Sequence, residues 1–510
     1  MTCDQGPSVS ITRRGLQRCA ALACQISAAL FLIVMTPHLS GALSQSVTIH
    51  PGDNIQRQVD QHGSGTTFVL TSGLYRLQSI TPKDGDSFIG EPGAILNGAK
   101  LLSSFEPQGR FWVARENIHQ VNAPGKCLPD HPACAFPEDL FVDDVPLQRV
   151  ASLSDVIPHK WYLDYDGDKI YLADNPSGHK IEISVTRHAF YGSASNVTIR
   201  GLIIEKYAPD AQFAAIDNLT ADEDPARVWV VAENEVRLCH GGGVKLGTGG
   251  QLLKNKIHHN GQIGVLGRGR DILIEDNEIA YNNFAGYDYN WEAGGSKFLF
   301  TENLMVRNNY VHDNRGPGLW TDGDNYNVVY ERNRTTGNTI AGIFHEISFG
   351  AAIRFNTIEN DGFNPRGGSY GAGIFVSASS NADVYGNNVT NCMNGILGIQ
   401  DNRGSSRRSG KPYLLQNLYV HDNIITQTTG IAAGILKVGK FDNSIFASWN
   451  NRFENNTYNL ADPIGKYYQW MNAARSKVEW QGFGNDVHGT WLTPAPAFPP
   501  VPIKKEALPQ

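Results

Sequence analysis

The chain has 510 residues, a formal net charge of −7 at neutral pH and an isoelectric point near 6.1. This mildly acidic balance, without a basic stripe along the chain, argues against a nucleic-acid partner. Glycine is frequent at 53 residues and only 18% of residues are charged, which favours a fold with many tight turns and few surface helices.

Residues 1–45 have the basic-then-apolar layout of an export signal. The segment Thr12–Leu16 reads Thr-Arg-Arg-Gly-Leu, which resembles a twin-arginine signal, and an apolar run from Ala20 to Met35 follows it. This run is short for a bilayer span, which needs about 20 residues. We therefore expect a periplasmic or extracellular protein, exported by the Sec or the twin-arginine route, with no stable membrane span after cleavage. An uncleaved membrane anchor is the alternative.

Residues 46–100 predict an N-terminal cap and the first coils of a solenoid. A short amphipathic helix is expected from Ile55 to Val59, with Asp53 or Asn54 as its cap. Such a helix covers the open end of the solenoid, where an uncovered coil would expose strand edges and core.

Residues 101–195 predict a β-rich insertion. The segment Trp161–Leu172 reads as a hairpin, because an Asp-Gly pair between two apolar runs favours a tight turn. Asp164, Asp166 and Asp168 alternate as in a calcium loop, but the rest of that pattern is missing, so we expect an ordinary hairpin turn.

The cysteines fit an exported protein. Cys127 and Cys134 bracket a short loop and are expected to form a local disulfide in an oxidising compartment. Cys239 and Cys392 occupy corner positions of the repeat described next, where buried, inert thiols are expected.

From residue 196 to 490 an asparagine recurs at one fixed corner, in the phrase apolar, two spacers, Asn, one spacer, apolar. The intervals run from 21 to 36 residues, which is typical of a solenoid. Short Ile- and Val-rich segments between the corners favour strands, so the sequence predicts an all-β, single-stranded right-handed parallel β-helix. Residues 491–510 form a Pro-rich tail, expected to be extended. The repeated asparagines are Asn234, Asn255, Asn277, Asn309, Asn333, Asn356, Asn387, Asn423 and, last, a position near Asn451.

A glycine opens one strand of each coil, and alignment on these glycines predicts which side chains face outward. Side chains alternate along a strand, so the second and fourth positions after the glycine leave the core. The alternative is that the strand bends after the second position, placing the aromatic residues inside and the acids in turns. The second positions are Leu266, Asp288, Trp320, Phe344, Phe375 and Leu397; the fourth are Arg268, Asn290, Asp322, Glu346, Ser377 and Ile399.

Outward aromatic residues beside carboxylates are what a sugar-binding cleft needs, because rings stack on sugars and acids bind hydroxyls or transfer protons. Adjacent coils lie ~4.8 Å apart, so Asp322 and Glu346 are predicted to be close neighbours and candidate catalytic acids. A separation near 5 Å suits a retaining glycosidase, whereas the diagonal pair Asp288 and Asp322, roughly 8 Å apart, suits an inverting one. Trp320, Phe344 and Phe375 are the candidate sugar-stacking residues, and Asp324 is a further candidate substrate-binding residue.

Three insertions are predicted to lie beside this strand and to build the walls of the cleft. They contribute the candidate substrate-binding residues Trp291, Glu292, Arg366 and Arg403. Plain surface decoration is the alternative interpretation.

Two further side chains have alternative roles. His345 is either a general base or, since alternation turns it away from Glu346, a histidine hydrogen-bonded within the wall. Lys297 is either a lyase base or a partner of Glu292. No cofactor is required, but an acidic cluster of this kind can hold Ca²⁺; its members are Asp288, Glu292, Asp322, Asp324 and Glu346.

The cap, the insertion with its Trp161–Leu172 hairpin and the asparagine repeat resemble secreted bacterial right-handed parallel β-helix proteins. That group includes pectate-lyase-like lyases, alginate-active lyases and epimerases, and several glycoside hydrolases. The segments around Trp291–Lys297, Trp320–Asp322 and His345–Glu346 are similar to clefts of β-helix glycosidases. The chain lacks the Asn-Thr-Asp and Gly-His-Gly signatures of polygalacturonases and the arginine motif of pectate lyases.

Three functions therefore remain open, all with a polysaccharide or oligosaccharide as partner. The first is a glycoside hydrolase that uses Asp322 with Glu346 or Asp288. The second is a uronate lyase or epimerase with Lys297 or His345 as base. The third is a non-catalytic carbohydrate-binding protein. The sugar, its linkage and the oligomeric state do not follow from the sequence.

Overall fold

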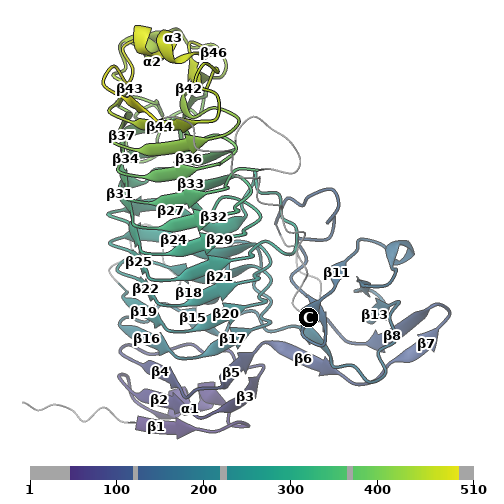
Figure 1. The fold of residues 1–510 in the computed structure, drawn as a ribbon. Helices are drawn as coiled ribbons and strands as arrows, with labels where there is room; N and C mark the ends of the chain where they lie inside the picture. Colours follow the sequence, from purple (N-terminus) through teal and green to yellow (C-terminus); the bar gives the residue numbers. More distant parts are fainter. Residues whose placement is uncertain (1–45, 119–123, 219–226, 364–370, 493–510) are drawn as a thin grey trace, which may run out of the picture. The chain divides into compact units, whose positions relative to one another are not determined.

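The computed structural model describes residues 46–118, 124–218, 227–363 and 371–492, which contain a parallel β-helix and a β-rich insertion (Figure 1). The predicted export signal lies outside the described residues, as does nearly all of the Pro-rich tail. Among the residues described, no helix is long and apolar enough to cross a membrane.

Three parallel faces make up the β-helix, two of them joined in a 25-stranded sheet and the third forming a 13-stranded sheet. The first face consists of β1 (Ser46–Ile49), β2 (Thr67–Leu70), β4 (Ser87–Gly90), β16 (Val197–Arg200), β19 (Trp229–Ala232), β22 (Gln251–Leu253), β25 (Leu273–Glu275), β28 (Met305–Arg307), β31 (Tyr326–Glu331), β34 (Phe349–Arg354), β37 (Ser380–Tyr385), β40 (Tyr419–His421) and β43 (Arg452–Glu454).

The second face, which we call the site face, consists of β15 (Phe190–Gly192), β18 (Ala214–Asn218), β21 (Gly242–Leu246), β24 (Ile263–Arg270), β27 (Gly294–Glu302), β30 (Leu319–Asp322), β33 (Ala341–Glu346), β36 (Ala372–Ser377), β39 (Ile396–Gln400), β42 (Ala433–Lys437) and β45 (Tyr468–Trp470), with β46 (Ala473–Arg475) antiparallel at its end. The third face consists of β3 (Gly73–Arg76), β5 (Ala94–Asn97), β17 (Ile203–Glu205), β20 (Glu235–Arg237), β23 (Lys256–His258), β26 (Glu278–Ala280), β29 (Tyr310–His312), β32 (Arg334–Thr336), β35 (Thr357–Glu359), β38 (Asn388–Thr390), β41 (Ile424–Gln427), β44 (Thr457–Leu460) and β47 (Thr490–Trp491).

Helices close the two ends of the solenoid. At the first end, α1 (Ile55–Gln61) buries Ile55 and Val59 in the main core, and the Asn54 side chain caps it by accepting from the Arg57 N–H at 2.8 Å. At the other end, α2 (Ser444–Ala447) and α3 (Lys477–Gly482) contribute Ile445 and Trp480 to the same core. The expected helical cap is therefore present, and a second one covers the last coils.

The recurring asparagines form a buried hydrogen-bonded ladder. At each rung the backbone N–H and the side-chain amide donate to the Oδ1 of the next rung; for Asn309 and Asn333 these distances are 3.1 and 3.0 Å. The predicted last rung near Asn451 is wrong. Asn423 instead donates to Asn456, which donates to Asp486, while Asn451 accepts from Leu418 at another corner.

A second ladder runs from Cys239 through Asn260, Asn282 and Asn314 to Asn338. It ends on Asp361, whose carboxylate accepts from Asn338 at 2.7 and 2.9 Å and from the Thr335 hydroxyl at 2.6 Å. Complete burial raises the pKa of Asp361 to about 7, although these hydrogen bonds oppose the shift.

Replacing Asp361 with asparagine is expected to remove a pH-dependent part of the stability. Because the pKa is raised in the folded state, this carboxyl group costs nothing below its unfolded pKa near 4, the cost grows as the pH rises from about 4 to about 7, and it is complete above that. The neutral amide avoids that cost, at most about 4 kcal/mol for three pKa units. Melting temperatures should therefore rise in Asp361→Asn at pH 8 and converge on wild type at pH 4. The control is Asp276→Asn at an exposed corner; equal shifts in both variants would contradict this explanation.

The β-rich insertion contains two small sheets in which most strand pairs are antiparallel. One contains β6 (Ala99–Leu102), β9 (Leu140–Val142), β10 (Val145–Pro146) and β14 (Ile181–Ser184); the other contains β7 (Glu106–Gln108), β8 (Phe111–Arg115), β11 (Gln148–Arg149), β12 (Lys160–Asp164) and β13 (Lys169–Leu172). The predicted hairpin is the β12–β13 pair, and the Asp164 side chain accepts from the Gly167 N–H in its turn.

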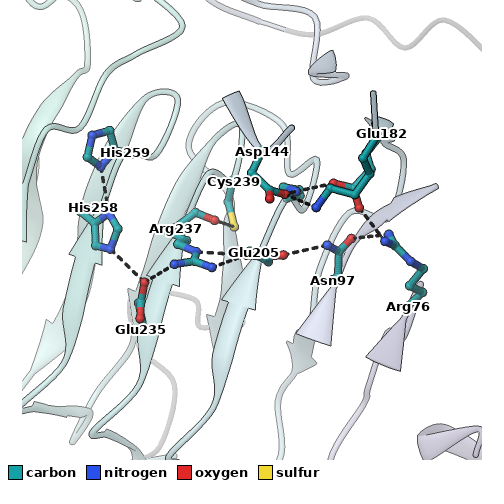
Figure 2. Close-up of polar contacts among 12 residues, drawn as sticks. Arg76, Asn97, Asp144, Glu182, Glu205, Glu235, Arg237, Cys239, His258 and His259 are labelled. Atoms are coloured by element: carbon teal, nitrogen blue, oxygen red, sulfur yellow. Dashed lines mark hydrogen bonds and ion pairs between the residues drawn. The ribbon is translucent and has the colours of Figure 1, made fainter. Parts of the chain in front are cut away.

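A network of ion pairs joins the insertion to the third face (Figure 2). Glu182 of β14 pairs with Arg76 at 2.7 Å and with the fully buried Lys206, which also pairs with Asp144. On the solenoid side, Glu205 accepts from Asn97 at 2.8 Å and pairs with Arg237. Buried charges need such partners, so this network fixes where the insertion is attached.

Candidate active site

The register of the site face places a row of aromatic residues outside the main core. Leu319, Ile343 and Ile374 pair across β30, β33 and β36 and point into the core. Their neighbours on the other side of the strands form a separate apolar cluster and stack in sequence. Trp320 lies 5.7 Å from Phe344, and Phe344 lies 4.9 Å from Phe375, centroid to centroid. The outward direction predicted for these rings is therefore correct, although loops leave them only 4–9% exposed.

The predicted register is wrong for one coil. Val265 pairs with Ser296 and Leu266 with Lys297, so Gly295, and not Gly286, is the glycine that continues the column. A side chain at Gly295 would meet the backbone oxygen of Gly318 at 2.5 Å. The insertion thus precedes the strand, and Lys297 takes the outward position assigned to Asp288.

Asp288 lies instead in the loop before β27, so the diagonal pair with Asp322 does not form. The Asp288 backbone N–H donates to the Lys126 oxygen, and the Asp288 carbonyl accepts from the N–H groups of Trp291 and Glu292. Cys127 and Cys134 are disulfide-bonded, and Cys127 forms a β-bridge with Tyr287. The disulfide loop therefore supports the loop that presents Glu292.

Lys297 is the centre of a buried charged cluster. Its ammonium lies 2.9 Å from Glu292 Oε1, 2.7 Å from Asp322 Oδ2 and 3.9 Å from the Trp320 ring centroid, and its side chain is 1% exposed. Burial, and then the Asp322 charge, raise the pKa of Glu292 against the opposing effect of Lys297. The predicted pair of Lys297 and Glu292 is therefore present, and Asp322 is a second partner of the same ammonium.

Glu346 lies beside Asp322 on the next coil, since the two residues are direct partners in the β30–β33 pairing. Glu346 Oε2 accepts from the Trp320 indole N–H at 3.1 Å, and Oε1 pairs with Arg403. Burial, followed by repulsion from Asp322, raises the pKa of Glu346, although Arg403 opposes the shift. One of two adjacent carboxyl groups is therefore biased toward its protonated form, while its neighbour pairs with an ammonium.

Glu346 is one of the residues that line a pocket of about 420 Å³. Asp322, Lys297 and Glu292 are not lining residues, but Asp322 pairs with the lining residue Glu346 between strands, and the side chains of Asp322 and Glu292 are each 16% exposed. The lining residues are Tyr289, Asn290, Pro317, Trp320, Ile340, Phe344, Glu346, Gly371, Phe375, Ser377, Ile399, Asp401 and Val438.

The segment 401–413 after β39 contributes Asp401 to the pocket lining and carries Arg403 to Glu346. Its attachment explains Asp324, which was expected to bind substrate. Asp324 is fully buried and accepts from the Arg407 N–H at 3.0 Å, so it anchors this loop. Arg408 adds an ion pair with Glu302 at 3.4 Å.

His345 is hydrogen-bonded within the wall, which is the second of its two predicted roles, whereas Trp291 differs from its predicted role. His345 points into the solenoid, where its Nδ1 lies 2.8 Å from the Thr321 hydroxyl and burial lowers its pKa to about 3; it does not reach the pocket. Trp291 stacks on Tyr287 at 6.2 Å and packs with the disulfide loop. Arg366 lies outside the described residues. Within the described ranges, no group of three His, Cys, Asp or Glu side chains could hold a metal, so the predicted acidic cluster does not assemble there as a calcium site.

Comparisons with known proteins give the same architecture. Residues 218–389 match the family model described as a right-handed β-helix region. The structure of XylC in complex with xylose is similar over 80% of this chain and 81% of that one, with a TM-score of 0.60 and 14% sequence identity. The A-module of the Azotobacter vinelandii mannuronan C-5 epimerase AlgE6 covers 86% of this chain, and 95% of its own length is matched, with a TM-score of 0.49 and 14% identity.

No curated protein sequence matches the chain. At 14% identity the XylC structure establishes the fold alone. The family match and the observed strand order agree with the resemblance inferred from the sequence. The chain thus contains a right-handed β-helix region and has the fold of the right-handed parallel β-helix proteins.

Proposed function

We propose that the protein is an exported glycoside hydrolase that retains anomeric configuration, with Asp322 as nucleophile and Glu346 as general acid and base. The observation that carries the proposal is the direct pairing of these two residues on neighbouring strands, one of which, Glu346, lines a pocket. Adjacent strands lie ~4.8 Å apart, and carboxyl groups about 5–5.5 Å apart are typical of retaining glycosidases.

The different surroundings of the two carboxyl groups support their different roles. Asp322 forms an ion pair with Lys297 at 2.7 Å, which holds its carboxylate in position to attack an anomeric carbon. Glu346 has a raised pKa, which favours the protonated form that a leaving-group oxygen requires. After the glycosyl-enzyme intermediate forms, the ionised Glu346 takes a proton from the incoming water, and the water displaces Asp322.

Aromatic side chains at the pocket support a saccharide as the ligand. Trp320, Phe344 and Phe375 all contribute to the pocket wall, and such flat apolar faces stack on sugar rings. Lys297 and Arg403 are both engaged with carboxylates, which favours an uncharged sugar over a uronate. A lyase using Lys297 as base is less well supported, because its ammonium donates to two carboxylates.

The test begins with a panel of polysaccharides and 4-nitrophenyl glycosides. We expect new reducing ends without the absorbance of unsaturated uronates, and proton NMR of the first product should show the anomeric configuration of the substrate. Reducing ends with that absorbance would indicate a lyase, and an inverted product would exclude Asp322 as nucleophile. Binding without turnover would support a carbohydrate-binding protein instead.

A further inference from the structure

Two carboxylate oxygens of the charged cluster have no hydrogen-bond partner. Glu292 Oε2 and Asp322 Oδ1 are both buried and unpaired, although the other oxygen of each group is held by Lys297. A buried acceptor without a donor costs about 1–3 kcal/mol, and a charged one costs more. Two such atoms on one ammonium-linked pair indicate that donors arrive with a ligand.

The position of the two unpaired oxygens relative to the reacting atoms indicates which hydroxyl of a sugar could donate to them. One oxygen of Asp322 must face the anomeric carbon if it is the nucleophile, and a single ammonium separates Asp322 from Glu292. The sugar hydroxyl nearest to that carbon is the one on the adjacent ring carbon, C2. A carboxylate beside the nucleophile is therefore placed to accept from the C2 hydroxyl, an interaction that strengthens in the transition states of glycosidases.

We infer that Glu292 binds the C2 hydroxyl of the sugar, that Lys297 holds Glu292 in place for this contact, and that the substrates are neutral glycosides with a free hydroxyl at C2. This inference rests on the proposed hydrolase activity. Burial raises the pKa of Glu292 although Lys297 opposes the shift, and only its Oε2 lacks a donor in the unliganded protein. A 2-acetamido substituent would replace the hydroxyl donor and add bulk where Glu292 and Lys297 are already packed.

The structure also shows how Glu292 is held in a fixed position, which it needs in order to distinguish substrates with a C2 hydroxyl from analogues without one. Its backbone N–H donates to the Asp288 carbonyl at 3.2 Å, and its carbonyl accepts from Gln262 Nε2 at 2.8 Å. The loop is backed by the Cys127–Cys134 disulfide through the Cys127–Tyr287 bridge. A hydrogen-bonding group fixed in this way rejects analogues that lack its partner.

The experiment compares the 4-nitrophenyl glycoside that wild type hydrolyses fastest with its 2-deoxy counterpart, in wild type, Glu292→Gln and Glu292→Ala. Both variants should lose about 10- to 100-fold in kcat/KM on the parent glycoside, the value of a hydrogen bond to a charged group. On the 2-deoxy substrate they should lose less than about threefold. For each protein, kcat/KM on the parent glycoside is divided by kcat/KM on the 2-deoxy glycoside. Comparing this ratio between wild type and variants cancels the intrinsic reactivity of the deoxy sugar. Glu359→Gln, on the third face and paired with Arg334, is the matched control.

Each outcome separates this inference from the activity on which it rests. Equal losses on the two substrates, with unchanged melting temperatures, would make Glu292 a structural residue and overturn the inference while leaving the hydrolase intact. Faster hydrolysis of 2-acetamido glycosides than of parent glycosides by wild type would overturn it as well. An absence of hydrolysis on every glycoside would instead overturn the proposed function itself.

Discussion

Replacing Asp322 with alanine is expected to lower kcat by about 10⁴-fold, the scale seen when a member of a catalytic group is removed. Without the carboxylate no glycosyl-enzyme intermediate forms, and Lys297 is left with Glu292 as its only ion-pair partner in the cluster. Initial rates on the best aryl glycoside and a thermal melt measure activity and folding separately.

Azide gives the Asp322→Ala variant a decisive second readout. A small anion that enters the vacated space should restore part of the rate and yield a glycosyl azide of inverted configuration, which NMR identifies. Asp383→Ala is the control, because this carboxylate lies on the first face and pairs with His421. Wild-type activity in Asp322→Ala would remove Asp322 from the mechanism.

Replacing Glu346 with glutamine is expected to have the second-largest effect, and one that depends on the leaving group. Loss of a general acid costs about 10²- to 10⁴-fold when the leaving group needs a proton. A 4-nitrophenyl glycoside, whose phenolate leaves without help, should lose much less in its first step than an alkyl glycoside does. The comparison of the two substrate types in one variant therefore identifies the acid.

The pH profile supplies an independent check of Glu346. Since burial and the Asp322 charge raise the pKa of this group, the active protonated acid persists above the usual range of a glutamate and is lost as the pH rises further. The fall of kcat/KM on the alkaline side in wild type should be absent from Glu346→Gln. The same alkaline fall in both proteins would assign it to another group.

The asparagine repeat predicts the coils well because a buried amide ladder leaves little freedom at its corner. Each rung must supply both donors and an acceptor to its neighbours, which asparagine does. The prediction failed at the last rung, where α2 is inserted before the corner. Asn456 matches the full phrase between Phe453 and Tyr458, whereas Asn451 has Ser448 in place of the first apolar residue. The prediction also missed Asp361 at the end of the second ladder. A carboxylate accepts from the preceding asparagine but has no N–H group to donate to a next rung, so it does not fit the repeated pattern.

The candidate site was predictable where the strand alternation is uninterrupted. Asp322 and Glu346 follow glycines on consecutive coils without insertions between glycine and acid, so their register could be counted. Asp288 could not be distinguished from Lys297, because Gly286 and Gly295 both fit the pattern and only contacts decide between them. The Arg403–Glu346 contact joins residues 57 positions apart through a loop, which no local pattern specifies.

The two acids sit at matching points of strands bonded to each other along the peptide backbone, and their spacing is therefore inherited from the main chain. Loops around them can be lengthened, exchanged or lost, and the sugar accepted by the protein can change with them. The gap between attacking and protonating groups stays at one rise of the spiral. Whether a product keeps or inverts its configuration is, on this scaffold, decided by choosing neighbouring or more distant rungs for the two acids.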